Sequence, residues 1–343
     1  MFCWLGQRHR ALIVAFGLFI VIAATFLFGL NSGYLRLSPA DVFSVLTGGG
    51  NPQQRMILIH FRLPRMAVAL LIGAGMAVSG AILQSITQND LADPGILGIN
   101  AGAGLAVVLF IFIFQGNTAA LGRLAIFLMP FFALGGAAAA AAAIYLLARN
   151  RRGVTPVRLI LSGVGINAGF SALITILQVQ MNPQDFIQAT IWLSGSIWGT
   201  DWPYVAAVAP WMFFFIPMAF FKAKTLSALE LGDTAATGLG IPVARERGLF
   251  LLIAVALAGA AVSVGGGIAF LGLIVPHLVR RLAGRTRQAL IPLSALMGAG
   301  LLLIADTVAR TLWAPAEIPV GLVVSAIGAP YFLFLLFREK RLK

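Results

Sequence analysis

The chain has 343 residues, of which 60% are hydrophobic and 10% are charged, and its mean hydropathy is +0.96. Soluble domains carry about 25% charged residues, so this composition excludes a sizeable water-soluble domain and indicates a polytopic membrane protein. The formal net charge of +13 comes from short basic clusters between apolar runs, which is typical of membrane topology signals and does not indicate a nucleic-acid binder.

The N-terminal part of the chain holds the first expected span. The apolar run 11–30 is longer than the hydrophobic region of a typical signal peptide, and no small-residue cleavage pattern follows it. We therefore expect a retained transmembrane helix. Cys3 is the only cysteine, which excludes a disulfide framework and a cysteine-based metal site.

Apolar runs of about 20 residues, the length that crosses the hydrocarbon layer as a helix, recur along the whole chain. The seventh and eighth are separated only by the glycine run 265–267, and the eighth is short and contains Pro276. We therefore expect a broken or re-entrant helix there. The ten predicted spans are 11–30, 66–87, 95–115, 124–148, 157–180, 203–221, 248–266, 268–283, 289–309 and 319–337.

The basic residues predict the orientation of these spans. With ten spans both termini lie on one side, and 18 of the 24 basic residues fall on that side, which the positive-inside rule places in the cytoplasm. These 18 are Arg8, Arg10, Arg149, Arg151, Arg152, Arg158, Lys222, Lys224, Arg245, Arg247, Arg280, Arg281, Arg285, Arg287, Arg338, Lys340, Arg341 and Lys343. The six on the outer side are Arg36, Arg55, Arg62, Arg65, Arg123 and Arg310.

Small residues recur at four-residue spacing inside several spans. Gly73 and Ala77 in the second span, Gly98 and Gly102 in the third, and Gly259 in the seventh belong to such series. This spacing lets helix backbones approach closely in lipid, so it predicts a tightly packed bundle.

Several chemical functions are not supported by the sequence. No G-x-x-x-x-G-K-[ST] motif occurs, so the chain does not cradle a nucleotide itself. Its three histidines, His9, His60 and His277, lack the spacing of metal ligands. Asp306 is the main acidic residue within a span, and Arg310 lies four residues later on the same helix face, which predicts a local ion pair. A proton-coupled carrier would normally show isolated mid-span acids.

Two cytoplasmic loops are expected to form contact surfaces. The first reads KAKTLSALELGDTAATGLGIPVARER and suits two short helices joined at Gly232-Asp233. Its small and apolar residues predict a protein partner, and the alternative is a helix that lies on lipid headgroups. The second loop begins at Thr87 and holds a polar turn with Asn89, Asp90 and Asp93.

Seven motifs follow one another in these spans and loops. They are RLPR (62–65), GAGMAVSGAILQ (73–84), LADPGILGINAGAG (91–104), LELGDTAATGLGIP (229–242), GGIAFLGLIVPHLVR (266–280), ADTVAR (305–310) and EIPVGLVVSAIGAPYF (317–332). Together and in this order, the motifs resemble the FecCD-type permeases of ABC importers for iron–siderophores, haem and cobalamin. The resemblance covers about residues 35 to 337.

The resemblance implies an all-α polytopic membrane protein of the type II ABC importer architecture, with residues 1–343 as a single transmembrane permease domain. Two permease chains would form the pathway in a homodimer or heterodimer. Two cytoplasmic ATPase subunits would carry the ATP and Mg²⁺, and an extracytoplasmic binding protein would deliver the substrate. The chain itself would bind no cofactor and catalyse no reaction.

Three groups of site residues are implied by the resemblance. The coupling loop 226–242 would fit a cleft in the ATPase, and its candidate residues are Leu226, Leu229, Leu231, Gly232, Asp233, Ala236, Leu239, Gly240 and Pro242. The cytoplasmic gate would involve Asn89, Leu91 and Thr155. The gate turn departs from the family pattern, because Asp90 stands where the usual NPLA motif has its proline.

The third group consists of the outer arginines Arg62, Arg65 and Arg310, which the resemblance implies receive acidic residues of the binding protein. Arginine presents a fixed fork of donors to a carboxylate, which suits such docking. Pro64 fixes the local backbone and is not expected to continue a preceding helix. The alternatives for each arginine are a headgroup anchor or an internal ion pair.

These observations predict the permease subunit of an ATP-driven importer, for ferric siderophores, in the bacterial plasma (inner) membrane with both termini in the cytoplasm. An importer of cobalamin or haem is the alternative within the same class. A stand-alone secondary transporter is the alternative from another class, and a structural membrane protein is a third. The coupling loop and the scarcity of mid-span ionisable groups favour the ABC importer.

Overall fold

The structure is a computed structural model that describes residues 2–33, 35, 37–95, 97–114, 123–150, 153–284, 289–312 and 316–339. Eight basic residues used in the predicted topology lie outside the described residues, namely Arg36, Arg151, Arg152, Arg285, Arg287, Lys340, Arg341 and Lys343.

The fold is almost entirely helical, apart from one antiparallel pair of two-residue strands. The first half of the chain forms α1 (Phe2–Asn31), α2 (Pro39–Leu46), α3 (Pro52–Arg55), the π-helical turn η1 (Met56–Arg62), α4 (Leu63–Thr87), α5 (Ile99–Ile113), α6 (Arg123–Ala148), β1 (Arg149–Asn150) and β2 (Gly153–Val154). The second half forms α7 (Pro156–Val179), α8 (Pro183–Leu193), α9 (Trp202–Phe221), α10 (Ala223–Glu230), α11 (Asp233–Gly238), α12 (Val243–Gly265), α13 (Leu271–Ala283), α14 (Leu290–Thr311) and α15 (Val320–Glu339).

Within the described ranges, seven helical stretches are long and apolar enough to cross a membrane, and α5 and α15 contain shorter apolar helices. The prediction of an all-α polytopic membrane protein is confirmed. Two predicted spans are shorter than expected: α5 has 15 residues and α13 has 13. At about 1.5 Å per residue, α13 covers about 20 Å of a hydrocarbon layer that is about 30 Å thick.

The expected break at the glycine run is present. α12 ends at Gly265, the backbone turns through positive φ at Gly266 (68°) and Phe270 (66°), and α13 starts at Leu271. This non-helical stretch is covered by protein, since Gly266 packs against the Trp192 carbonyl. A membrane protein tolerates irregular backbone at such a depth only where protein or a cavity surrounds it.

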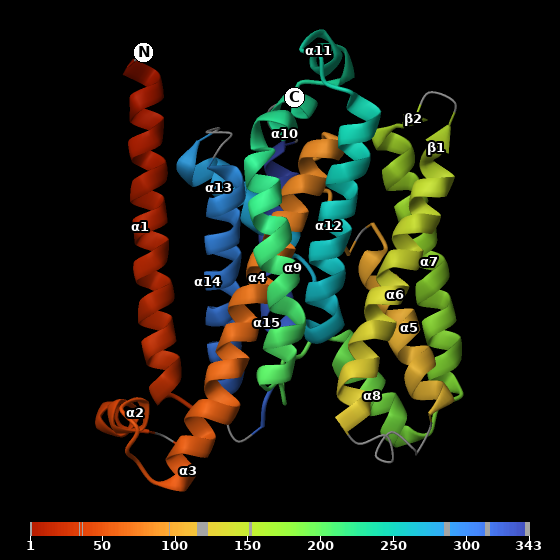
Figure 1. Ribbon diagram of the computed structural model, residues 1–343. Helices are drawn as coiled ribbons and strands as arrows, with labels where there is room; N and C mark the ends of the chain where they lie inside the picture. Colours follow the sequence, from red (N-terminus) through yellow and green to blue (C-terminus); the bar gives the residue numbers. More distant parts are fainter. Residues whose placement is uncertain are drawn as a thin grey trace.

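The arrangement of the helices supports the predicted orientation. The start of α1 and the end of α15 lie at the same end of the bundle as α10 and α11, while α2, α3 and α8 lie at the opposite end (Figure 1). Following the predicted topology, we call the first the cytoplasmic end and the second the outer end. Helices α5 to α8 pack together on one side of α12 (Figure 1).

Small residues create the closest helix contacts, as the four-residue spacing predicts. A Cβ on Gly73 of α4 would overlap the Gly298 carbonyl of α14, and one on Gly102 of α5 would come too close to the Gly136 carbonyl of α6. Close backbone approach of this kind replaces the missing hydrophobic effect between helices in lipid. It makes α4 the most buried of the long helices.

The RLPR motif lies at the junction of η1 and α4. Against expectation, Pro64 does not end the preceding helix, because the chain passes from α3 into α4 through the π-helical turn Met56–Arg62. Proline has no N–H and its ring clashes with the carbonyl four residues earlier. The wider π turn relieves that conflict without breaking the helix.

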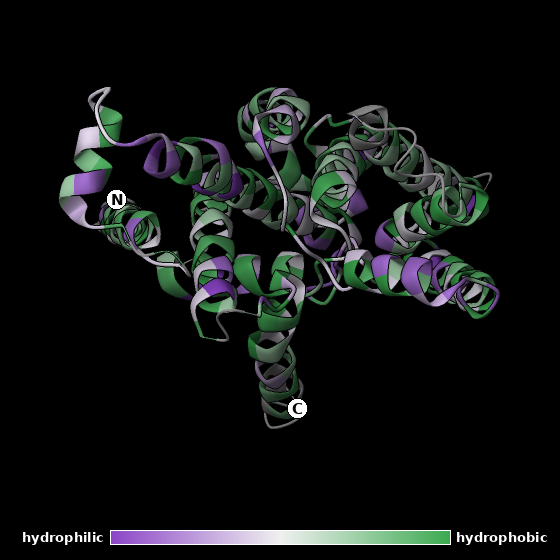
Figure 2. Cartoon of the chain, turned by 90° about the horizontal axis from the view of Figure 1, so that it is seen from below, coloured by the Kyte–Doolittle hydropathy of each residue, from purple (hydrophilic) through white to green (hydrophobic). Residues whose placement is uncertain are grey.

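The outside of the bundle is apolar. Seen from the outer end, hydrophobic residues are spread over the outward-facing helices, and α15 extends away from the other helices (Figure 2). Leu322, Ile327, Leu333 and Phe334 on α15 are each about half exposed. Lipid or a second apolar surface must cover such side chains.

Candidate functional site

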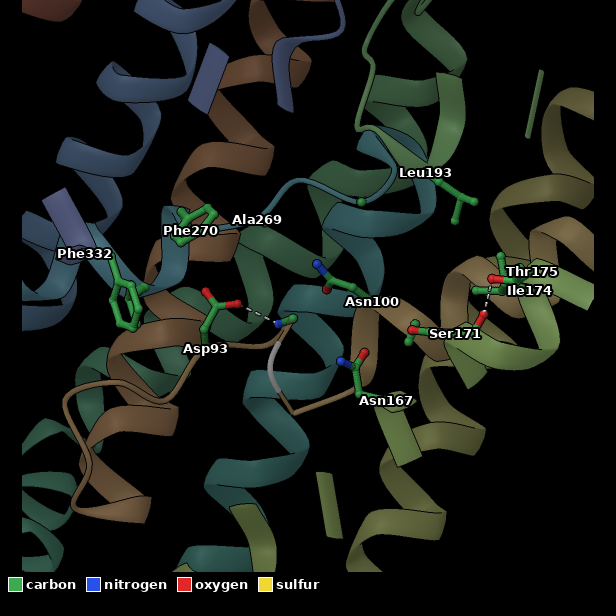
Figure 3. Close-up of a pocket in the computed structure, with 14 residues that line it drawn as sticks. Asp93, Asn100, Asn167, Ser171, Ile174, Thr175, Leu193, Ala269, Phe270 and Phe332 are labelled. Carbon is green, nitrogen blue, oxygen red and sulfur yellow. Dashed lines mark hydrogen bonds between the residues drawn. The ribbon is translucent and has the colours of Figure 1, made fainter. Parts of the chain in front are cut away.

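A cavity of about 580 Å³ lies between α5, α7, α13 and α15, where the α12–α13 break opens the bundle (Figure 3). Phe270 and Phe332 lie on one side of it, and Asn100, Asn167 and Ser171 lie on the other (Figure 3). The remaining lining residues are Asp93, Gly95, Ala101, Ile174, Thr175, Leu193, Gly267, Ala269 and Leu273.

The loop before α5 shapes one wall of the cavity. The Asp93 carboxylate accepts a 2.7 Å hydrogen bond from the Gly95 amide, which forms a tight turn. Gly98 then adopts a left-handed conformation with φ 80° and leads into α5. Asn100 Nδ2 donates to the Ile268 carbonyl at 3.2 Å, and this bond holds α5 against the broken stretch before α13.

The opposite polar wall belongs to α7. Asn167, Ser171 and Thr175 follow one another at four-residue spacing, so they share one helix face. All three line the cavity. This four-residue spacing of polar residues within an apolar span can be recognised in the sequence. It would have predicted a polar wall on this helix, which we did not predict.

The lining of the cavity is polar but almost uncharged. In the part of the lining that the structure describes, the polar side chains are amides and hydroxyls together with the carboxylate of Asp93, and no lysine, arginine or histidine is present. The rings of Phe270 and Phe332 lie 6.4 Å apart, centroid to centroid. The arrangement suits a bulky polar ligand without net negative charge.

Glycines make close backbone contacts beside the cavity, on the side of the outer end. The Gly321 amide donates to the Gly195 carbonyl at 2.9 Å, and the Gly267 amide donates to the Trp192 carbonyl at 3.3 Å. A Cβ on Gly321 would overlap the Ser194 carbonyl oxygen. We call the contact of residues 192–195, 266–268 and 321 the glycine seal.

The three outer arginines are buried and bonded within the chain. Arg65 Nε donates to Asp306 Oδ1 at 2.8 Å, and Arg65 Nη1 donates to Glu317 Oε2 at 2.7 Å. The Asp306 side chain is fully buried and that of Glu317 is 30% exposed. The expected local pair of Asp306 with Arg310 is replaced by this link between α4, α14 and the segment before α15.

Arg62 and Arg310 contact the C-terminal end of α1. Arg62 donates to the carbonyls of Leu30 and Leu35, and Arg310 Nη2 donates to the Gly29 carbonyl at 3.0 Å. The last carbonyls of a helix lack intrahelical donors and carry partial negative charge, so cations cap them well. The two arginines therefore tie the peripheral helix α1 to α4 and α14.

The coupling loop forms two short helices, α10 and α11, with Gly232 between them at φ 100° as the sequence predicts. Its apolar residues divide into two sets. Leu226, Leu229 and Ala236 are buried within the chain, while Leu231 and Leu239 are 51% and 65% exposed. Asp233 is bonded to Arg247 of α12 at 2.5 Å, and Gly240 and Pro242 lead into α12.

The predicted gate residues lie in two separate segments. Asn89 Oδ1 accepts from the Leu91 amide at 2.9 Å, which makes a compact turn directly after α4. Thr155 precedes α7 and its carbonyl accepts the first hydrogen bond of that helix, from the Leu159 amide. None of the three lines the cavity.

Comparisons with known proteins agree with this architecture. Residues 20–338 match the FecCD transport family. The chain is 52% identical over 332 residues, covering 97% of it and 98% of the relative, to the iron(3+)-hydroxamate import system permease protein FhuG of Bacillus subtilis (strain 168). It is 43% identical over 328 residues, covering 95% of it and 98% of the relative, to the iron-uptake system permease protein FeuC of the same organism.

A solved structure of an inward-facing transporter, assigned to the metal-chelate ABC type, superposes with a TM-score of 0.83 at 29% sequence identity. The match covers 95% of this chain and 99% of that chain. With the family match and the 52% identity over nearly the whole length, the chain belongs to the FecCD transport family and is the membrane permease subunit of an ABC importer.

Proposed function

We propose that the chain forms one half of the pathway of a ferric siderophore importer and that its substrates are neutral ferric hydroxamates. The observation that carries the proposal is the lining of the cavity, which among the residues that the structure describes has one carboxylate and no cationic side chain. Three hydroxamate groups each carry one negative charge and together neutralise Fe³⁺. Three catecholate groups each carry two and leave a trianion.

The electrostatic difference between these chelates is large. A unit negative charge about 7 Å from the Asp93 carboxylate is opposed by about 2 kcal/mol at an effective dielectric constant of about 20. A trianion meets about three times that opposition, and the described lining residues include no lysine, arginine or histidine. Amides and hydroxyls such as those of Asn100, Asn167 and Ser171 can instead hydrogen-bond to a neutral chelate.

Sequence similarity supports the same substrate class. The relative with 52% identity is named for iron(3+)-hydroxamate import, and a ferric enterobactin permease of Escherichia coli is 35% identical. Haem, with its two propionates, is opposed by the same carboxylate. The charge argument does not distinguish cobalamin from a neutral ferric hydroxamate. The iron-related names of the relatives favour a ferric chelate over cobalamin.

The rest of the transport system follows from the architecture. Residues 1–343 would act as a single permease domain in the plasma membrane, with both termini in the cytoplasm. A second permease chain would pack against the exposed apolar face of α15 and complete the cavity. Two ATPase subunits would hold ATP and Mg²⁺ and would contact the exposed Leu231 and Leu239 of the coupling loop.

The outer end would receive the binding protein. Glu317 is the exposed member of the Arg65 cluster, so a carboxylate of the binding protein can reach Arg65 only by competing with Glu317. Arg62 and Arg310, whose donors are directed to α1, would contribute mainly positive potential to that docking surface. The turn with Asn89 and Leu91, together with Thr155, would form the cytoplasmic gate.

Uptake assays in a strain that lacks this chain test the proposed substrate. Complementation is expected to restore uptake of labelled neutral ferric trihydroxamates and to leave tricatecholates and cobalamin at background. Asn167→Lys is expected to lower trihydroxamate uptake several-fold and to relax the exclusion of the anion, while Asn167→Gln stays near wild type. Restoration of tricatecholate or cobalamin uptake alone would contradict the proposal.

A further inference from the structure

One arginine connects four segments at the cytoplasmic end. Arg280 lies on α13, and its Nη1 donates to Gln84 Oε1 of α4 at 2.6 Å and to Asp90 Oδ1 of the gate turn at 3.2 Å. Its Nη2 lies 3.9 Å from Glu230 Oε1 at the end of α10. The guanidinium group therefore contacts the cavity-side helices, the gate turn and the coupling loop together.

Two further bonds join the coupling loop to the end of α4. Ser85 Oγ donates to Glu230 Oε1 at 2.5 Å, and Gln88 Nε2 donates to the Leu229 carbonyl at 3.0 Å. A displacement of α10 therefore acts both on Arg280 and on the last turn of α4.

The same contacts continue to the wall of the cavity. Gln84 accepts from Arg280 and donates, through Nε2, to the Leu273 carbonyl at 3.1 Å and the Gly272 carbonyl at 3.3 Å. Leu273 lines the cavity. A chain of direct contacts thus runs from the coupling loop through Arg280 and Gln84 to the substrate pathway.

The bonds in this chain differ in burial. Gln84 is 2% exposed, whereas the side chains of Asp90 and Glu230 are 70% and 32% exposed. Solvated ion pairs contribute about 0 to 1 kcal/mol, so the bonds of Arg280 to Asp90 and Glu230 can exchange readily. The buried bond to Gln84 keeps the guanidinium in place while its exposed partners move.

Asp90 is the residue through which the gate turn takes part in this arrangement. Its carboxylate accepts the hydrogen bond from Arg280, whereas the proline that the NPLA motif of the resembled family has at this position offers no side-chain acceptor. The bond from Arg280 therefore attaches the gate turn to α13 through a side chain.

We propose that Arg280 is a positioning residue that transmits movement of the coupling loop to the gate turn and to the cavity wall at Leu273. The inference rests on the proposed function, in which ATPase subunits move α10 and α11. A guanidinium is required because its two Nη atoms face different partners. The single ammonium of a lysine cannot bond in both directions with the same geometry.

The test uses the whole transporter, with its ATPase subunits and binding protein, in proteoliposomes. ATP hydrolysis and ferric trihydroxamate uptake are measured together, and the readout is the number of chelates transported per ATP. Arg280→Gln is expected to lower that ratio at least tenfold, and Arg280→Lys several-fold, while ATP hydrolysis changes less than twofold. Arg281→Gln, at the exposed neighbour on α13, is the matched control and keeps the wild-type ratio.

A merely structural role predicts a different pattern, in which uptake and hydrolysis fall together and the ratio is unchanged. An unchanged ratio in the assembled Arg280→Gln transporter overturns the proposal. If that variant does not assemble, Asp90→Asn with Glu230→Gln decides instead, because neither side chain is buried and both substitutions keep the shape of the side chain. A ratio in this double variant lower by threefold or more supports the proposal, and a smaller change overturns it.

Failure of the proposed function is a separate result. It is recognised from the wild-type transporter, which would then show no trihydroxamate uptake stimulated by the binding protein and ATP. The effect of Arg280 is in that case measured with whichever chelate the wild type transports.

Discussion

The two ends of the molecule are both held by arginines, but in different surroundings. At the outer end Arg65 joins α4, α14 and the segment before α15 through Asp306, whose side chain is fully buried. At the cytoplasmic end Arg280 joins α13 to α4 through the buried Gln84, and to the gate turn and α10 through the side chains of Asp90 and Glu230, which are 70% and 32% exposed. Breaking a buried pair costs about 3 to 5 kcal/mol, whereas an exposed pair contributes about 0 to 1 kcal/mol.

This difference separates a fixed part of the bundle from a part that can move. The outer cluster joins helices that also pack through Gly73 and Gly298 in the buried centre. We call the contacts of Arg280 with Gln84, Asp90 and Glu230 the cytoplasmic junction. Its bonds to Asp90 and Glu230 can exchange partners, because such ion pairs contribute only about 0 to 1 kcal/mol. The glycine seal, made of backbone contacts and few hydrogen bonds, lies between these extremes, and we expect the pathway to open there on the outer side.

The largest effect is expected from Asp306→Asn. Removing this charge leaves Arg65 buried without its main counter-ion, so we expect a loss of about 3 to 5 kcal/mol of stability. Thermal unfolding of the purified protein in detergent checks this, with Asp90→Asn as the control for an exposed pair. An equal decrease in Tm for the two variants would contradict the claim that the ion pair at the outer end stabilises the protein more than the pair at the cytoplasmic end.

The second effect concerns the glycine seal. Gly321→Ala introduces a Cβ that overlaps the Ser194 carbonyl, so the seal is expected to stay partly open, and overpacking of this kind costs about 1 to 3 kcal/mol. In a Cys3→Ser background, Ser171→Cys should react faster with an impermeant thiol reagent added from outside when Gly321→Ala is also present than when it is not.

Gly165→Ala is the matched control, because a Cβ at Gly165 meets no atom within 4 Å. If Gly321→Ala and Gly165→Ala gave the same labelling rate, the glycines would not be the outer closure.

The third effect is at the coupling loop. Leu231→Arg places a charge on the exposed apolar surface of residue 231 and is expected to reduce association with the ATPase subunits at least tenfold. Leu46→Arg is the control, since Leu46 is similarly exposed but lies at the outer end. Co-purification of the ATPase in equal amounts with both variants would contradict the proposed coupling surface.

The smallest effect distinguishes docking from a purely internal role of Arg65. If a binding-protein carboxylate competes with Glu317, Glu317→Gln should raise the affinity for the binding protein several-fold, since a partly exposed pair contributes about 1 kcal/mol or less. Surface plasmon resonance with the purified permease measures this. An unchanged Kd would leave Arg65 as a structural residue only.

Much of the fold could be predicted from local patterns. The apolar runs, the break after Gly265 and the division of the coupling loop at Gly232 depend on residue type and spacing within one segment. The polar stripe Asn167, Ser171 and Thr175 was equally legible, because four-residue spacing places side chains on one helix face.

The orientation of the arginines could not be predicted in this way. Arg65 and Glu317 are separated by 252 positions, and Arg280 and Gln84 by 196. Which carboxylate or carbonyl lies within reach depends on helix packing that no local pattern encodes. The π-helical turn at Met56–Arg62 was not predicted either, since proline normally signals a helix end and the sequence pattern does not show that a wider turn accommodates it.

The central claim is that the outer cluster of Arg65, Asp306 and Glu317 stays fixed when ATP binds. The segments around Arg280 at the cytoplasmic end are the ones that move. Hydrogen–deuterium exchange of the assembled transporter, with and without ATP, tests it most directly. The account predicts altered exchange in the gate turn, α10 and the end of α13, with unchanged exchange around Arg65 and Asp306. Altered exchange at the outer cluster with none at the cytoplasmic junction would contradict it.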